Sequence, residues 1–193
     1  MERIKEILTN PVTAILKAKK EKNLNKTLSI LILSWILVGI SFFLAFYKTA
    51  LILVAFGSAL AIFLFGILFS IFYSYVIDIV MNIIGGKGKY YDSLTAATYS
   101  SLPISIGILL TSMLSEVHPV LGVIIGFIVI AVTTALSLSI YFRAIKEFYS
   151  TDMFMTFVGF LLILYVFMIA FYISTAFSIS SMLFGSLLPN FGV

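Results

Sequence analysis

The sequence predicts an all-α integral membrane protein with five transmembrane helices, and three observations lead to this fold class. Hydrophobic residues make up 62% of the chain and charged residues only 10%, with a mean hydropathy of +1.18, whereas a water-soluble domain carries about 25% charged residues. Long apolar runs without charge recur along the chain. The basic residues gather in alternate segments between these runs, as they do in multi-pass membrane proteins.

Five apolar runs are long enough to cross a bilayer, because a spanning helix needs about 20 residues. They cover approximately residues 27–47, 50–84, 93–115, 120–142 and 153–188. The second run is longer than the bilayer requires, so we expect its helix to tilt, to kink or to project from the membrane. The chain is accordingly divided into a basic N-terminal segment, residues 1–26, and a five-span membrane domain, residues 27–193.

The distribution of basic residues predicts the orientation. In this topology eleven of the twelve Lys and Arg residues fall on one side of the membrane, and the exception is Lys48. The eleven comprise seven in residues 1–26, followed by Lys87, Lys89, Arg143 and Lys146. Because loops rich in Lys and Arg stay in the cytoplasm, the N-terminus is predicted to be cytoplasmic and the C-terminus to lie outside.

Residues 1–26 also carry a helical pattern. Apolar residues recur there at the spacing of one helix face, and Asn10 followed by Pro11 is a favourable N-cap and first-turn pair. The sequence therefore predicts a short amphipathic helix, a break and a second helix. This segment either lies in the membrane interface with its lysines over anionic headgroups or packs on the bundle.

A stripe of small and polar residues follows the second predicted span at four-residue intervals: Gly66, Ser70, Ser74, Asp78 and Asn82. Residues at this spacing share one face of a helix. An ionisable side chain in a span is costly unless it faces protein or water. Ser70, Ser74, Asp78 and Asn82 thus form a candidate intramembrane polar site, in which Asp78 binds a proton or cation. Alternatively, Asp78 lies at the interface and pairs with nearby basic side chains or water.

The connection between the second and third spans is rich in glycine. Gly85 and Gly86 suit a helix C-cap, where a left-handed backbone favours glycine, and Asp92 or Ser93 suits the next N-cap. Pro103 falls inside the third span and removes one backbone hydrogen bond there.

Three basic residues next to these turns are candidate contacts for lipid headgroups or for a partner: Lys87, Lys89 and Arg143. The alternative is that these basic residues only determine the orientation of the helices in the membrane. The turn is not a nucleotide-binding loop, because the G-x-x-x-x-G-K-[ST] pattern is missing and no strand precedes it.

Little in the sequence favours an enzyme. The chain has no cysteine, and its one histidine, His118, falls in a short outer turn. Glu116 and Asp152 are predicted on opposite sides of the membrane, so they cannot act as a catalytic pair. We therefore expect no catalytic residue, no metal site, no cofactor and no nucleic-acid partner.

The tract "GGKGKYYDSLTAATYSSLPIS", after a long second span and before three more, resembles the YIP family of Ypt-interacting proteins and their prokaryotic relatives. The matching positions are Gly85, Gly86, Gly88, Tyr99, Ser100, Ser101, Leu102 and Pro103. The opening "LTNPVTAILK" is similar to a segment that begins many prokaryotic members.

The resemblance implies a five-span membrane domain of the prokaryotic type, located in a plasma membrane. Eukaryotic members bind prenylated Rab-type GTPases and one another, but the long N-terminal region linked with that role has no counterpart here, so a GTPase partner is not supported. We expect a non-catalytic scaffold or adaptor that organises membrane proteins, itself included, or lipids. The alternative is a small lipid or ion transporter with Asp78 in its pathway.

Overall fold

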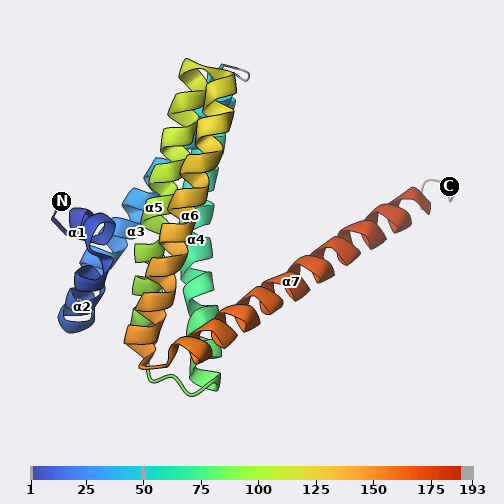
Figure 1. The fold of residues 1–193 in the computed structure, drawn as a ribbon. Helices are drawn as coiled ribbons and strands as arrows, with labels where there is room; N and C mark the ends of the chain where they lie inside the picture. The colour runs from blue at the N-terminus through green and yellow to red at the C-terminus, as the bar shows by residue number, and fades with distance from the viewer. Residues whose placement is uncertain (1, 49–50, 188–193) are drawn as a thin grey trace.

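Seven α-helices and no strand are found in residues 2–48 and 51–187, the part of the chain that this computed structural model describes (Figure 1). The helices are α1 (Glu2–Thr9), α2 (Pro11–Glu21), α3 (Leu24–Phe46), α4 (Ile52–Ile83), α5 (Tyr90–Val117), α6 (Pro119–Tyr149) and α7 (Met153–Leu187). Among the side chains of residues 170–187, only that of Thr175 is described. Residue 50, where the second span was predicted to begin, and the uncharged tail 188–193 lie outside the described residues.

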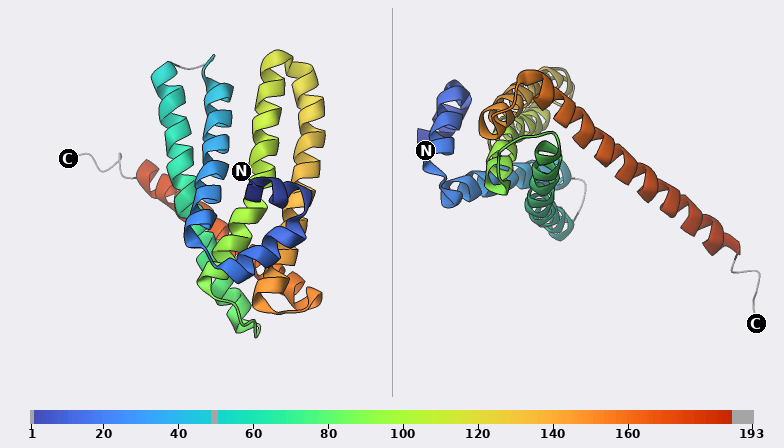
Figure 2. Two further views of the ribbon diagram at one scale, coloured as in Figure 1. Left: turned by 90° about the vertical axis from the view of Figure 1, so that its left-hand side faces the viewer. Right: turned by 90° about the horizontal axis from the view of Figure 1, so that it is seen from below.

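Helices α3 to α6 form an upright bundle of two antiparallel pairs (Figure 2). The tightest pair is α5 with α6, while α3 packs against α5 and α4 packs mainly against α3. Helix α7 contacts α4 and α6 near its beginning and then runs away from the bundle (Figures 1 and 2).

Among the described residues, four helices, α3 to α6, are long and apolar enough to cross a membrane. In α7, the section Met153–Ile169, whose side chains are described, is apolar as well. The predicted all-α class is thus confirmed and four of the predicted spans are candidate membrane helices, while the fifth span and the orientation stay predictions.

Small residues set the close approach of α5 and α6. A Cβ atom added to Gly107 would lie 2.2 Å from Thr133 Oγ1, and one added to Gly126 would lie 2.4 Å from Thr111 Cγ2. Because apolar burial drives helix association only weakly in lipid, close backbone packing of this kind is a main source of bundle stability.

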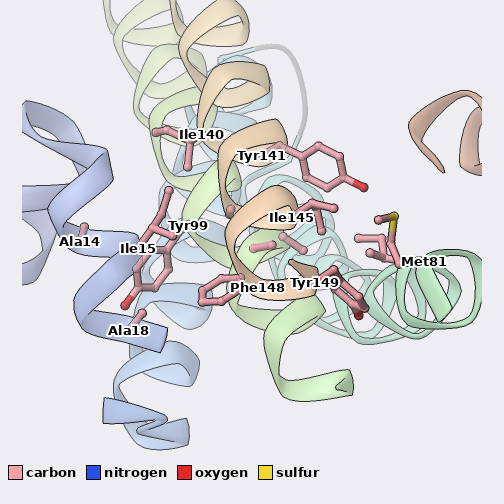
Figure 3. Packing of buried hydrophobic residues seen from close by; sticks show 14 of the residues in the cluster. Ala14, Ile15, Ala18, Met81, Tyr99, Ile140, Tyr141, Ile145, Phe148 and Tyr149 are labelled. Carbon is pink, nitrogen blue, oxygen red and sulfur yellow. The ribbon is translucent and has the colours of Figure 1, made fainter. Parts of the chain in front are cut away.

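The N-terminal segment is folded as predicted, with a break at Asn10. The Asn10 side chain accepts a hydrogen bond from the backbone N–H of Thr13 at 3.4 Å, and Pro11 begins α2. The segment packs on the bundle, and its contact with lipid headgroups stays a prediction. Ile15 and Ala18 of α2 are buried in the same core cluster as side chains of α5 and α6 (Figure 3).

Helix α6 ends later than predicted. The fourth span was expected to end at residue 142 and to be followed by a loop, but the helix continues to Tyr149. The reason is a buried helical face in the added turns, formed by Ala144, Ile145 and Phe148 together with Tyr149. Arg143 therefore lies on a helix rather than in a turn.

The N-cap of α5 was also predicted wrongly. Lys89, not Asp92 or Ser93, occupies the cap position, and Asp92 lies in the first turn. The Asp92 carboxylate accepts a hydrogen bond from the backbone N–H of Lys89 at 2.9 Å. An acid in a first helical turn is favourable because unpaired N–H groups and the positive end of the helix dipole lie there. Pro103 lies inside α5, which continues to Val117.

Candidate functional site

The stripe on α4 divides into a packing half and a polar half. In the packing half, Trp35 of α3 lies against Gly66, where an added Cβ atom would be 2.0 Å from the indole ring. Trp35 Nε1 also donates a hydrogen bond to Ser70 Oγ at 2.8 Å. Ser74 Oγ donates to the backbone carbonyl of Ser70 at 2.6 Å. Gly66, Ser70 and Ser74 are therefore committed to contacts within the protein.

The polar half centres on Asp78, which is half-buried. Its Oδ1 atom accepts a hydrogen bond from the hydroxyl of Tyr149 at 2.8 Å and one from Asn82 Nδ2 at 3.1 Å. The ion pairs found in the described part of the chain do not include Asp78. The structure brings Asp78 to a tyrosine of α6 rather than to the basic side chains weighed from the sequence.

Tyr149 was not singled out by the sequence, yet it lies at the centre of this region. It is fully buried although it is the last residue of α6 (Figure 3). The connection at residues 85–89, here called the glycine turn, closes around it. Lys87 N donates a hydrogen bond to the carbonyl of Tyr149 at 3.0 Å.

The three glycines of the turn have distinct physical roles. Gly85 has a φ of +92°, which a side chain disfavours, and Gly86 N donates to Met81 O at 2.8 Å, which closes the end of α4. Added Cβ atoms at Gly86 and Gly88 would lie 2.8 Å and 2.6 Å from the Tyr149 ring. The clustered glycines were the sequence signal for Tyr149, because glycine is favoured where the backbone passes close to a large side chain.

The basic candidates are placed in two locations. The side chains of Lys87 and Lys89 are exposed on the glycine turn. Arg143 lies on the exposed face of α6, where it lines a hollow of about 320 Å³ together with Lys146 and Glu147.

Of the five other family positions, all of them in α5, Tyr99, Leu102 and Pro103 are buried. Tyr99 is 2% exposed and lies beside Ile15 and Ala18 of α2 (Figure 3). Lys19 of α2 also joins this helix to α6, because its Nζ donates a hydrogen bond to the backbone carbonyl of Glu147. The family tract therefore organises the end of the bundle that holds α2, the glycine turn and the end of α6, which we call the basic end.

At the opposite end, the α3–α4 and α5–α6 connections meet. Lys48 forms an ion pair with Glu116, and the Tyr47 hydroxyl donates to Glu116 Oε2 at 3.1 Å. The hydrogen bond with Glu116 raises the pKa of Lys48. His118 is the N-cap of α6, where its Nδ1 accepts from Leu121 N at 3.3 Å.

The residues that the structure describes contain no group of three acidic, histidine or cysteine side chains suited to a metal ion. The arrangement as a whole joins helices, and Lys87, Lys89 and Arg143 are exposed on it.

Comparison with known proteins yields one match. No curated protein and no solved structure matches the chain. The sequence model of the Yip1 domain family matches residues 5–187, which include all the helices from α2 to α7. The Yip1 domain family is not a known enzyme family. Since the match extends over nearly the whole chain, this protein is a multi-pass membrane protein that belongs to the Yip1 domain family.

Proposed function

We propose that this protein is a non-catalytic scaffold or adaptor, which organises other membrane proteins or lipids in a prokaryotic plasma membrane. Membership of the Yip1 domain family and the apolar helices support a role within the bilayer. The observation that carries the proposal is helix α7, which leaves the bundle and presents apolar side chains that the rest of the chain leaves uncovered.

The proposed topology has five spans with a cytoplasmic N-terminus. Helix α7 serves as the fifth span, since it is 35 residues long and carries no charged residue. Eleven Lys and Arg residues fall in residues 1–26, in the glycine turn and in the last turns of α6, and the twelfth, Lys48, lies at the opposite end of the bundle. The positive-inside rule then assigns the basic end to the cytoplasm.

The described part of α7 has the character of an interaction surface within the membrane. Phe157, Leu161, Tyr165 and Met168 are exposed along it. Helices in lipid associate through close packing, and aromatic and methionine side chains supply large, adaptable contact areas. A second membrane protein, or a second copy of this chain, is the proposed occupant.

A photo-crosslinking amino acid placed at Leu161 or Tyr165 of α7 tests this proposal in native membranes. The matched control is the same amino acid at Phe127 of α6, whose side chain is 77% exposed. We expect a discrete protein adduct from the two α7 positions and none from Phe127. Adducts with lipid alone at all three positions would contradict the scaffold.

A lipid or ion transporter is the second candidate, favoured by an apolar groove of about 500 Å³ between α3 and α4. Gly39 lies in this groove, with Phe43 and Phe63 on its walls. In this candidate an acyl chain occupies the groove, and Asp78 with its partner Tyr149 forms the polar step of the pathway.

Purified protein in liposomes separates the two candidates. For the transporter, Asp78→Asn abolishes pH-dependent ion flux or lipid movement. Asp152→Asn is the matched control, because Asp152 caps α7 through a hydrogen bond from Met155 N and asparagine caps equally well. Equal activity in the wild type and in both variants removes Asp78 from any mechanism.

A further inference from the structure

A polar pocket that the scaffold role does not use lies between α1, α2 and the beginning of α3. Its volume is about 540 Å³, within the roughly 300–1,000 Å³ typical of small-molecule sites. Five charged side chains line it: Arg3, Glu6, Lys17, Glu21 and Lys26.

The charges of this pocket do not cancel. Arg3 Nη2 and Lys26 Nζ both donate to the same Glu21 oxygen, at 2.7 Å and 2.8 Å, and Lys17 pairs with Glu6. Three cations and two carboxylates leave one net positive charge. The hydrogen bond from Lys26 lowers the pKa of Glu21, so this carboxylate stays ionised at neutral pH.

Two of the cations keep donors for a ligand. Arg3 is held in place by α2, since its Nη1 donates to the Ala14 carbonyl at 3.2 Å, and its side chain is only 14% exposed. A guanidinium has five N–H donors and an ammonium has three, so Arg3 and Lys26 retain unused donors beside Glu21. Such donors suit the oxygens of a phosphate group.

Exposed apolar side chains on the three helices that form the pocket favour a lipid as the source of this phosphate. Leu8, Leu16 and Leu24, one on each of the three helices, are between 37% and 48% exposed. Lys26 is the last charged residue before the apolar run of α3. Exposed apolar side chains next to basic ones are typical of a surface at the level of the headgroups.

We propose that this pocket binds the phosphodiester of one phospholipid with a net negative headgroup, such as phosphatidylglycerol. The inference deepens the lipid part of the proposed function and rests on α3 crossing the membrane. Arg3 and Lys26 hold the phosphate oxygens, and the acyl chains lie along the apolar part of α3.

Native mass spectrometry of the protein in neutral detergent tests the site, with phosphatidylglycerol or phosphatidylcholine added in steps. We expect one phosphatidylglycerol to bind more tightly than phosphatidylcholine, and Lys26→Ala to weaken its binding about tenfold, as loss of a charge-assisted hydrogen bond does. Lys26→Arg should restore the affinity. Lys20→Ala is the matched control, because Lys20 is an exposed lysine of α2 that does not line the pocket.

Three results would overturn the site. Equal losses in Lys26→Ala and Lys20→Ala would mean that the lipid responds only to surface charge. Equal binding of the two lipids would remove the role of net charge. Displacement of the lipid by water-soluble glycerophosphoglycerol at matched concentration would identify a free phosphate ester as the ligand. Because the protein adducts of α7 are a separate measurement, the pocket and the scaffold fail independently.

Discussion

At the basic end of the bundle, the end of α6 is enclosed by α2 and the glycine turn, whereas at the opposite end the connections meet through exposed side chains. At the basic end, Tyr149 is buried and is hydrogen-bonded through its hydroxyl to Asp78 and through its carbonyl to Lys87. At the opposite end, Glu116 binds the exposed Lys48 and Tyr47. Exposed ion pairs contribute little, because water and salt screen them. Specific structure, and with it the family tract, is concentrated at the basic end.

The strongest way to break this contrast is Gly86→Ala. The added Cβ atom would lie 2.8 Å from both the Met81 carbonyl oxygen and the Tyr149 ring. We expect a loss of about 2 kcal/mol in the free energy of unfolding, typical of overpacking, measured by thermal or denaturant unfolding in detergent. Gly57→Ala is the control, since a Cβ atom there meets nothing within 4 Å. Equal stability of the two variants would mean that the glycine turn is loose.

A smaller effect is expected from Tyr149→Phe, which removes the hydroxyl that donates to Asp78 and keeps the ring. A lost hydrogen bond of this kind costs about 1 kcal/mol. In a double-mutant cycle with Asp78→Ala, which removes the acceptor of this hydrogen bond, the two changes should be less than additive, because both remove the same interaction. Strict additivity would show that the two side chains do not interact.

The smallest effects concern the pH dependence of two exposed groups. Glu21 has a lowered pKa, mainly through its hydrogen bond from Lys26. Its contribution to the free energy of unfolding is therefore present above the unfolded pKa and is lost as pH falls through the folded pKa. Lys48 has a raised pKa, mainly through its hydrogen bond with Glu116. Its contribution to the free energy of unfolding is therefore present below the unfolded pKa and is lost as pH rises through the folded pKa. NMR titration of labelled Glu and Lys side chains measures both directions.

The variant Lys26→Ala should bring the Glu21 titration back toward that of a free glutamate, and Glu116→Gln should do the same for Lys48 relative to a free lysine. Unchanged midpoints in these variants would assign the two shifts to other groups.

Local patterns in the sequence were sufficient for much of the fold. The class, the amphipathic segment, the Asn10 break and the left-handed Gly85 each depend on a few neighbouring residues. The residue that packs against Gly66 and Ser70 was not predictable, because Trp35 lies in another helix. The partner of Asp78 was missed for the same reason. The sequence predicted Tyr149 in a loop, because it is followed by the polar residues Ser150, Thr151 and Asp152. Its burial is explained only by its tertiary contact with Gly86 and Gly88.

The enclosure of Tyr149 also constrains the order of events during synthesis. The glycine turn leaves the ribosome well before α6, yet the hydrogen bond of Lys87 requires the carbonyl of Tyr149. Until α6 is complete, the backbone of the turn therefore lacks its native partner and stays hydrated. The hydrogen bonds of the basic end are therefore complete only after the last residue of α6 has been added.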